Sequence, residues 1–270
     1  MSRAYVLGHS EHERRRLQLQ AAMLAPYTTR FFVEAGIAEG MRVLDLGCGV
    51  GDVSLLLGHL VGPAGAVRGI DIDEASLSVA RNRAVQHQFR NMVFDHADIA
   101  DFFTDGRYDA VVGRLILQHM EDPVAILRRA ASLVRPGGIV AFQDCAPGLN
   151  VPSWPKCPQM ERALDLIARF AVLAIPQYTA GTRLYHWFLD AGLAAPKVET
   201  RVLTEGGPDS VCYEWLAETL RSIMPRAISL GLAEVGEFNL ETLAAEIREE
   251  ALETGTPMNA AILTGVFAKV

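Results

Sequence analysis

The chain has 270 residues, half of them hydrophobic and about a fifth charged. This balance is typical of a globular protein with a sizeable core, built as one large domain or as one domain with an appendage. The formal net charge is −7. An acidic balance argues against a protein that binds nucleic acid, because neutralising phosphates needs clustered cations.

The cysteines and the N-terminal stretch narrow the class further. The four cysteines are scattered and show no CxxC spacing, so we expect neither a disulfide framework nor a metal site. The N-terminal stretch is too charged for a secretory signal peptide, and no apolar run reaches the ~18 residues of a membrane span. We therefore expect a cytoplasmic protein without membrane or nucleic-acid partners, acting as a monomer or homodimer.

The first predicted elements are one or two amphipathic helices over residues 10–35. Strands then alternate with helices as far as residue 145, a pattern typical of a parallel sheet built from βαβ units. The predicted strands are short, apolar and bounded by turn residues: 42–46, 66–72, 92–96, 110–113 and 139–144. The predicted helices between them are 52–60, 74–88 and 123–134. Asp73 and Asp122 are suited to cap the second and third of these helices.

The pattern changes after residue 144, where an irregular, proline-bearing stretch follows. Further helices are predicted at 160–173, at 182–191 and within 209–255, and further strands at 195–203 and 261–270. The helical segments on either side of the alternating region are suited to cover a ligand. They are equally suited to complete the hydrophobic packing, and both interpretations stay open.

The strongest local signal is a glycine-rich turn between a buried strand and a helix. The strand at 43–46 runs into Gly47, Gly49 and Gly51, and a helix is predicted from Asp52. Glycines let the backbone bend sharply and let a bulky ligand approach where a Cβ would block it. The amide groups at the start of the helix favour a negatively charged ligand group. Such a turn alone fits any nucleotide-binding protein.

Two carboxylates narrow the ligand. Asp45 lies two residues before Gly47, where a carboxylate would repel a pyrophosphate but would attract a sulfonium or an ammonium group. Asp71 ends the next predicted strand, and an acid there can accept hydrogen bonds from both ribose hydroxyls. Helix capping, the alternative role for Asp71, fits Asp73 better. The pair predicts a nucleoside-binding site.

Several motifs in the same order resemble the class I S-adenosylmethionine-dependent methyltransferases, in their small-molecule methyltransferase-domain branch. The resemblance covers about residues 40–145. The matching segments are Asp45-x-Gly47-x-Gly49-x-Gly51, Gly69-Ile70-Asp71, Asp95-His96-Ala97-Asp98-Ile99, the segment from Asp109 to His119, and Leu133-Val134-Arg135-Pro136-Gly137-Gly138. The agreement of several ordered motifs is more specific than the glycine turn alone.

The resemblance implies an α/β fold with a doubly wound, mostly parallel, seven-stranded Rossmann-like sheet, helices on both faces and an antiparallel last strand. It also implies S-adenosylmethionine as the cofactor, released as S-adenosylhomocysteine. The expected domains are an N-terminal helical lid at 1–38, a cofactor-binding domain at 39–205 and 259–270, and a helical cap insertion at 206–258.

The resemblance also implies which residues contact the cofactor. These are Tyr5, Gln20, Asp45, Gly47, Gly49, Asp71, Ile72, Asp98, Ile99 and Arg114. The two glycines would contact the methionine portion and Asp71 the ribose. Ile72 would pack on the adenine ring, and Asp98, with Ile99 alongside, would accept a hydrogen bond from its amino group. Arg114 would bind the methionyl carboxylate or would only form a surface pair.

Tyr5 and Gln20 lie in a leader that resembles those of this branch, where the leader folds over the cofactor. Helix capping and core packing are the alternative roles for this leader.

Methyl transfer from a sulfonium is an in-line displacement, so the protein must mainly align the reactants and exclude water. A general base is needed only when the acceptor must lose a proton. His119, just past the fourth predicted strand, is the first candidate base, and His186 is the second. A structural role in helix capping or packing is the alternative for each.

The sequence therefore predicts an enzyme that methylates O, N or C of a small, apolar or aromatic metabolite. Two other classes stay open. One is a protein that binds S-adenosylmethionine without transferring its methyl group. The other is a nicotinamide-dependent oxidoreductase on a similar fold, which would bind NAD and would tolerate Asp45→Asn.

Overall fold

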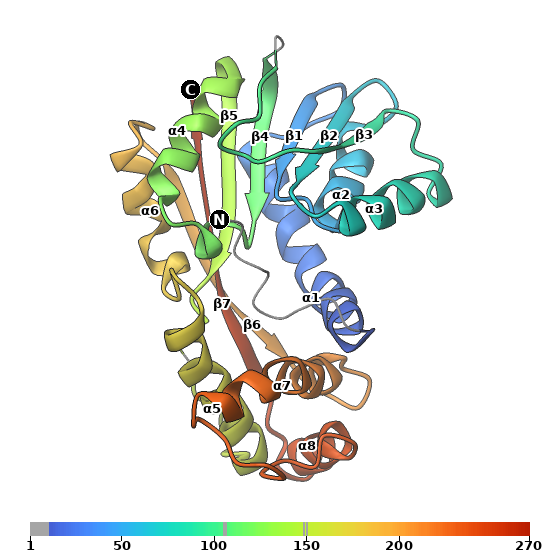
Figure 1. Ribbon diagram of the computed structural model, residues 1–270, viewed down its shortest axis with the longest axis vertical. Helices are drawn as coiled ribbons and strands as arrows, with labels where there is room; N and C mark the ends of the chain where they lie inside the picture. Colours follow the sequence, from blue (N-terminus) through green and yellow to red (C-terminus); the bar gives the residue numbers. More distant parts are fainter. Residues whose placement is uncertain (1–10, 105–106, 148, 150) are drawn as a thin grey trace. The chain divides into compact units, whose positions relative to one another are not determined.

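The computed structural model describes residues 11–104, 107–147, 149 and 151–270 of the chain. Its elements are labelled in Figure 1. In chain order they are α1 (Glu11–Ala35), β1 (Arg42–Leu46), α2 (Asp52–Val61), β2 (Ala66–Asp71), α3 (Glu74–Gln86), β3 (Met92–His96), β4 (Tyr108–Arg114), the short 3-10 helix η1 (Leu117–His119), α4 (Pro123–Leu133), β5 (Val134–Cys145), α5 (Pro158–Ala174), α6 (Ala180–Asp190), β6 (Lys197–Glu205), α7 (Cys212–Ser229), α8 (Leu243–Thr254) and β7 (Met258–Lys269).

The chain forms two compact units. The sheet unit comprises Ala25–Asp144, Ala180–Thr200 and Thr264–Val270. The helical unit comprises the described residues up to Leu24 together with Cys145–Thr179 and Arg201–Leu263. The division into lid, cofactor-binding domain and cap that the sequence led us to expect stays a prediction.

Seven strands of the described residues form one mixed sheet in the order β3-β2-β1-β4-β5-β7-β6. The pairs β1–β2, β2–β3, β1–β4 and β4–β5 are all parallel. β7 runs antiparallel to β5: Val270 N donates to Gly138 O, whereas just past the end of β5 Ala146 N donates to Ile262 O, earlier in β7. The predicted fold class is confirmed. The strand order reverses between β1 and β4, where open α/β sheets bind their ligands.

Side chains alternate between the two faces of the sheet, as they must along a strand. On one face Val43 of β1 packs in a cluster with Phe31 of α1 and with residues of α2. On the other face Leu44 packs in a cluster with Leu127 of α4 and Phe188 of α6. The helices α4 and α6 lie side by side there (Figure 1). The sheet unit therefore has an apolar core on both faces.

The helical unit has its own apolar core, to which α5, α7 and α8 contribute. The first turns of α1 join α7 through ion pairs, with 2.8 Å between Arg15 Nη2 and Glu214 Oε1 and 3.1 Å between His12 Nδ1 and Glu218 Oε2. No helix among the described residues has the length and apolar character needed to cross a lipid bilayer.

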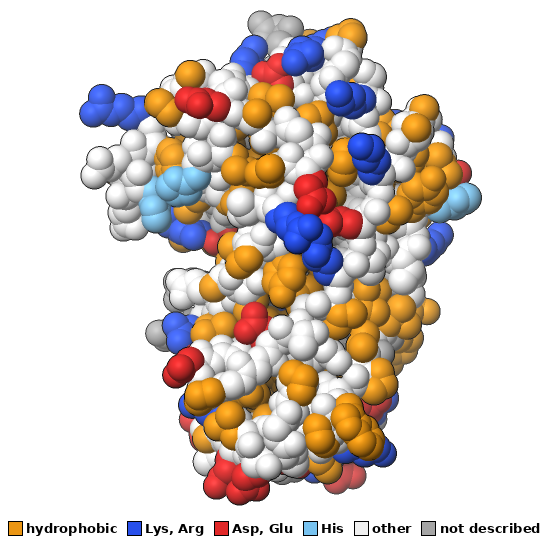
Figure 2. All heavy atoms as spheres, turned by 180° about the vertical axis from the view of Figure 1, so that it is seen from behind, with side chains coloured by type: hydrophobic (Ala, Val, Ile, Leu, Met, Phe, Trp, Pro, Cys, Tyr) orange, Lys and Arg blue, Asp and Glu red, His pale blue; other side chains and the backbone are white. Residues whose placement is uncertain are grey.

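Charges of both signs are mixed on the protein surface. On the face shown in Figure 2, Lys and Arg side chains are interspersed with acidic and apolar ones. Ion pairs within single helices, such as Arg30 with Glu34 and Arg169 with Asp165, contribute to this mixture.

Of the two possibilities left open for residues 10–35, one helix or two, the structure has one over residues 11–35, and it contains Pro26. The structure differs from the predicted elements in two later places. The helical stretch at 209–255 is divided into α7 and α8. β5 begins at Val134, five residues before the strand predicted from residue 139, and includes Gly137 with a φ of 77°. This early start is supported by a contact distant in sequence, because Gly137 N donates to the carbonyl oxygen of Val270, the residue that follows β7.

Candidate functional site

The glycine turn lies between β1 and α2, and its glycines adopt the left-handed backbone that other residues avoid. The φ angles are 68° at Gly47, 53° at Gly49 and 84° at Gly51. A Cβ added to Gly47 would lie 2.6 Å from Cδ1 of Ile116, whereas no described atom lies within 4 Å of a Cβ added to Gly49. A side chain at Gly47 would therefore have to displace Ile116, whereas Gly49 borders space that a ligand can occupy.

Asp71, at the end of β2, holds the glycine turn in place. Its Oδ2 accepts a hydrogen bond from Gly49 N at 2.8 Å, and its Oδ1 accepts one from Asp73 N at 2.9 Å. A carboxylate oxygen has more than one lone pair, so both oxygens keep capacity for a ligand hydroxyl. The contact with a ribose stays a prediction, but the structure adds a positioning role for this residue. The predicted cap, Asp73, does cap α3, accepting from Ala75 N and Ser76 N.

Asp45 is a buried carboxyl group, only 1% exposed, near the end of β1 and just before the glycines. Ser54 Oγ of α2 donates to its Oδ2 at 2.6 Å. Burial raises the pKa of Asp45 from 3.8 to about 7, against the opposing effects of the Ser54 hydrogen bond and the Arg114 cation. A further positive charge nearby would favour the ionised form. The site therefore fits a ligand that carries a sulfonium or ammonium group.

The ends of β2 and β3 provide the residues expected beside an adenine. Ile72 follows Asp71 and is 54% exposed, so an apolar surface is open to a ligand there. Ala97 N donates to Asp71 O, which joins the end of β3 to the end of β2. Asp98 is exposed, and its Oδ1 accepts from Ala100 N at 2.9 Å. The side chain of Ile99 is buried in the core, which leaves its backbone as the group that can face a ring.

Arg114 ends β4 on the opposite side of the glycine turn. Its Nη1 donates to Oγ1 of Thr28, a buried residue of α1, at 3.2 Å. The next residue, Leu115, has a φ of 56°, a strained value for a residue with a side chain, and its N–H donates to Gln143 O at 2.8 Å. The guanidinium is thus part of the sheet unit and lowers the pKa of Asp45.

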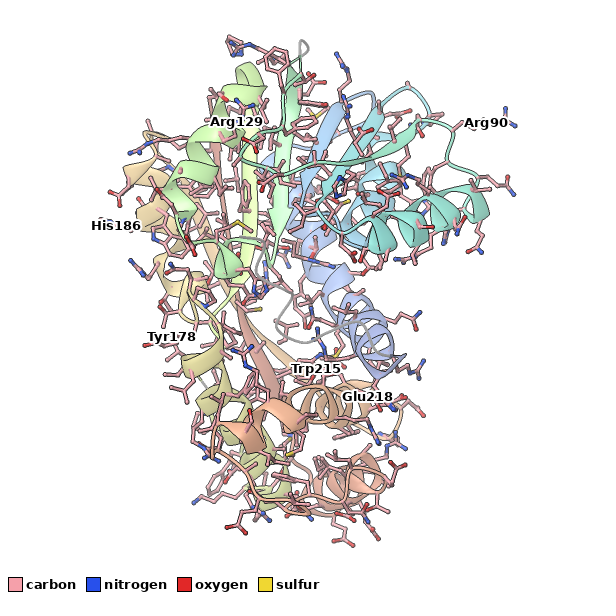
Figure 3. The ribbon with its side chains drawn as sticks, in the orientation of Figure 1. Arg90, Arg129, Tyr178, His186, Trp215 and Glu218 are labelled. Carbon is pink, nitrogen blue, oxygen red and sulfur yellow. The ribbon has the colours of Figure 1, made fainter. Side chains whose placement is uncertain are left out.

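The two candidate bases lie in different surroundings. His119 ends η1, is half-buried, and is held by a hydrogen bond from its N–H to Ile116 O. The same segment is fixed by Leu117 N, which donates to Oδ2 of the buried Asp144 at 2.9 Å. His186 is 76% exposed on the outer side of α6, with its Nε2 3.5 Å from Oδ2 of Asp190 (Figure 3). His119 therefore stays close to the carboxyl ends of the strands, and His186 points to solvent.

None of the contacts between described residues links Tyr5 or Gln20, the two predicted cofactor contacts of the N-terminal leader, to the residues around the glycine turn. Tyr5 lies outside the described residues. Gln20 belongs to the helical unit, where its Oε1 accepts from Nη1 of the buried Arg16 at 2.7 Å. A cofactor contact by either residue stays a prediction.

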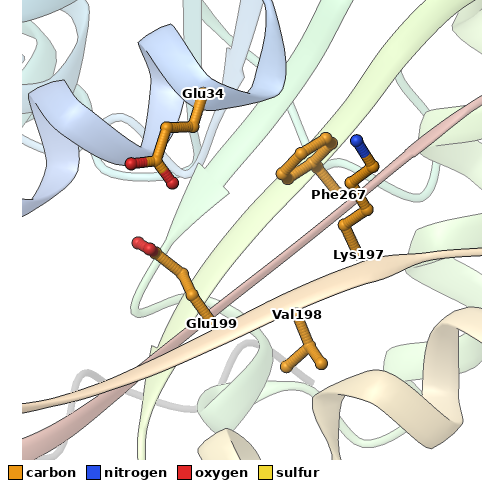
Figure 4. A pocket seen from close by; sticks show the side chains of 5 residues that line it. All are labelled: Glu34, Lys197, Val198, Glu199 and Phe267. Carbon is orange, nitrogen blue, oxygen red and sulfur yellow. The ribbon is translucent and has the colours of Figure 1, made fainter.

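A pocket of about 360 Å³ lies elsewhere in the sheet unit (Figure 4). It is lined by Glu34, Lys197, Val198, Glu199 and Phe267. Because β7 is antiparallel, Phe267 near its end lies toward the amino ends of the parallel strands. Ligands of such sheets bind at the carboxyl ends, so this pocket is separate from the glycine turn.

The sequence did not single out three residues that shape the site: Ser54, Leu115 and Gln143. Ser54 is a buried hydroxyl between Val53 and Leu55, and a polar residue on an apolar helix face was an available signal. Gln143 likewise interrupts an apolar run in β5. Nothing in the sequence marks Leu115, because leucine rarely adopts a positive φ.

A doubly wound sheet with a glycine turn at its reversal point defines a protein class that binds nucleotides or nucleosides. The family comparison is more specific. Residues 37–192, more than half of the chain, match the family described as "Methyltransferase domain". The chain belongs to this family.

Similar proteins include two curated methyltransferases. The chain is 33% identical to the arsenite methyltransferase of Aquipseudomonas alcaligenes over 135 residues, 47% of this chain and 39% of that protein. It is 38% identical to the ubiquinone biosynthesis O-methyltransferase of Acinetobacter baylyi over 158 residues, 57% of this chain and 60% of that protein. The matches thus span less than two thirds of these relatives.

Among solved structures, the phosphoethanolamine N-methyltransferase 2 of Haemonchus contortus, in complex with S-adenosyl-L-methionine, is similar with a TM-score of 0.57. The sequences are 16% identical, and the match covers 90% of this chain and 52% of that one. This likeness shows the shared fold.

Proposed function

We propose that the protein transfers the methyl group of S-adenosylmethionine to an O, N or C atom of a small molecule. The observation that carries this proposal is the buried carboxyl of Asp45 directly before a glycine turn that leaves space at Gly49. A carboxylate there opposes a pyrophosphate and favours a cationic ligand. Membership of the methyltransferase-domain family supports the same assignment.

In this proposal each part of the cofactor has a partner in the sheet unit. Asp71 binds the ribose hydroxyls, and Ile72 and Asp98 bind the adenine. The backbone at Gly49 borders the methionine portion, and Arg114 binds its carboxylate. The arrangement is supported by the exposed side chain of Ile72 and by the hydrogen bonds that fix Asp71 against the glycine turn.

S-adenosylmethionine supplies an activated methyl group with its own leaving group. The residues of the chain have to align the acceptor with that methyl group and exclude water. His119 is the base we propose for acceptors that must lose a proton, because η1 keeps it near the carboxyl ends of the strands. Acceptors that are already nucleophilic need no such base.

The cysteines favour an organic acceptor over arsenite, the substrate named for one relative. Binding of a soft element such as arsenic needs several cysteine side chains gathered at one site. Among the described residues no group of three or more Cys, His, Asp or Glu side chains is arranged to hold a metal ion, and three of the four cysteines, Cys48, Cys157 and Cys212, are buried. We therefore infer an apolar or aromatic organic acceptor, in line with the relative named for ubiquinone biosynthesis.

The proposal is tested with S-adenosylmethionine labelled in its methyl group and a panel of phenols, quinols, amines and arsenite. We expect label in an organic product, with one S-adenosylhomocysteine formed for each methyl group transferred. Binding of S-adenosylmethionine without release of S-adenosylhomocysteine across the whole panel would contradict methyl transfer and favour a protein that only binds the cofactor. Tight binding of NAD in its place would favour an oxidoreductase.

We also propose that the protein acts in the cytoplasm, as a monomer or homodimer without a membrane or nucleic-acid partner. The net charge of −7 supports the last point, because a nucleic-acid surface needs an excess of cations. Size-exclusion chromatography with light scattering measures the oligomeric state directly.

A further inference from the structure

Gln143 is a buried polar residue close to the end of β5 that none of the contacts described so far explains. It is 1% exposed. Its backbone carbonyl accepts from Leu115 N, but its side-chain Oε1 accepts no hydrogen bond from any described residue. Buried side-chain acceptors are rarely left without a partner in native proteins, so each such group calls for an explanation.

The strand register places Gln143 among the polar groups of the site. Gln143 pairs with Arg114 in the neighbouring β4, and Asp45 of β1 pairs with Val112, two residues before Arg114. Because side chains alternate along a strand, these three polar side chains lie on the same face of the sheet. This is the face that α1 covers, where Arg114 contacts Thr28.

That face is apolar further back along the strands and becomes polar only at the carboxyl ends. The positions that precede the polar groups on the same face are occupied by small or branched apolar residues: Val43, Ala110, Val112, Ile139 and Ala141. Open α/β sheets bind their ligands just beyond these strand ends. The polar residues therefore mark where the buried face meets the ligand.

The neighbouring side chains of Arg114 and Gln143 are chemically complementary to an α-amino acid. A guanidinium only donates hydrogen bonds and is suited to a carboxylate, whereas a side-chain carbonyl oxygen accepts them and is suited to an ammonium group. Neighbouring strands are about 4.8 Å apart, so the carboxylate and ammonium of one amino acid can contact Arg114 and Gln143 together.

We propose that Gln143 is a cofactor-binding residue whose side-chain carbonyl accepts a hydrogen bond from the α-ammonium group of S-adenosylmethionine, next to the carboxylate held by Arg114. This inference rests on the proposed function. The carboxyl of Asp45 lies on the same face on the other side of Arg114, where it acts on the guanidinium rather than on the ammonium group. The methionine end of the cofactor is thus recognised by β4 and β5 together, and Gln143 selects for ligands that keep the amino group.

The test compares two ligands by calorimetry. S-adenosylhomocysteine carries the amino-acid end, and 5′-methylthioadenosine lacks it. We expect Gln143→Met, which keeps the length of the side chain but removes its carbonyl, to weaken S-adenosylhomocysteine binding tenfold to a hundredfold. The affinity for 5′-methylthioadenosine should stay within twofold. Gln143→Glu, which keeps an acceptor oxygen, should retain most of the affinity for S-adenosylhomocysteine.

Thermal unfolding without ligand separates binding from folding. Removing a buried acceptor that has no partner should leave the melting temperature of Gln143→Met unchanged or raised. The control is Gln159→Met, which removes a side chain whose Nε2 donates to Oε2 of Glu246 at 3.2 Å in the helical unit. It should lower the melting temperature slightly and leave both affinities unchanged.

Each contrary result has its own meaning. Unchanged S-adenosylhomocysteine binding in Gln143→Met would overturn this inference alone and would mean that a bound water satisfies the carbonyl. Equal losses for both ligands with a lowered melting temperature would also overturn it and would assign Gln143 a structural role. A wild-type protein that binds neither ligand would overturn the proposed function, and this inference with it.

Discussion

The buried carboxyl of Asp45 makes folding stability depend on pH in a way that one substitution should remove. Burial raises its pKa in the folded protein to about 7 from a reference value of 3.8. The neutral form is therefore preferred in the folded state. The contribution of this group to stability is largest below about pH 3.8 and is lost progressively as the pH rises toward 7.

The size of the effect follows from the two pKa values, because a tenfold change in an acid dissociation constant corresponds to about 1.4 kcal/mol. At pH 8 both states are ionised, and the buried charge opposes folding by about 4 kcal/mol. At pH 5 the folded side chain is protonated while the unfolded one is ionised, and the opposing free energy is about 2 kcal/mol. Asp45→Asn keeps an acceptor for Ser54 Oγ and removes the charge.

We therefore expect Asp45→Asn, without cofactor, to raise the free energy of unfolding by about 2–3 kcal/mol more at pH 8 than at pH 5. Urea unfolding followed by circular dichroism at the two pH values measures this difference. Asp165→Asn, at an exposed side chain of α5, is the control and should shift stability by less than about 0.5 kcal/mol at either pH. Equal changes for Asp45→Asn at both pH values, or a larger gain at pH 5, would refute the reasoning.

Three further substitutions test the site. Gly49→Ala should lower the free energy of unfolding by only about 1 kcal/mol, because alanine is strained at a φ of 53°. The same substitution should weaken S-adenosylhomocysteine binding more than tenfold in calorimetry. Undiminished affinity would contradict a ligand at this glycine. Ile72→Ser should change the free energy of unfolding by less than about 0.5 kcal/mol. It should weaken S-adenosylhomocysteine binding about fivefold, because roughly 1 kcal/mol of apolar contact with the adenine is lost. Equal affinity in the variant and the wild type would argue against adenine packing at Ile72. His119→Gln should reduce kcat by about a hundredfold for an acceptor that must lose a proton, with cofactor affinity retained, and an unchanged kcat would remove the proposed base.

The architecture follows from local features of the sequence. Alternating apolar strands and helices predicted the parallel sheet, and the cap at Asp73 and the glycines at 47, 49 and 51 are where the sequence indicated. These signals are local because strand length, helix capping and positive φ depend on a few neighbouring residues. Asp45 and Asp71 could likewise be found from their spacing to the glycines.

Other parts of the site depend on contacts between distant segments and could not be read in this way. The tie from Asp71 to Gly49 N exists only once β1 and β2 are paired. Gln143 lies next to Arg114 only because β4 and β5 pair in a particular register. From the sequence, Gln143 is recognisable only as a polar residue within a buried strand. The extended start of β5 is fixed by the last residue of the chain.

The most direct test of the central claim is a crystal structure of the protein with S-adenosylhomocysteine. We expect the ligand at the carboxyl ends of β1, β2 and β4, with its ribose on Asp71, its adenine beside Ile72 and its amino-acid end at Arg114. A ligand bound away from the glycine turn, or one whose ribose does not contact Asp71, would contradict the claim.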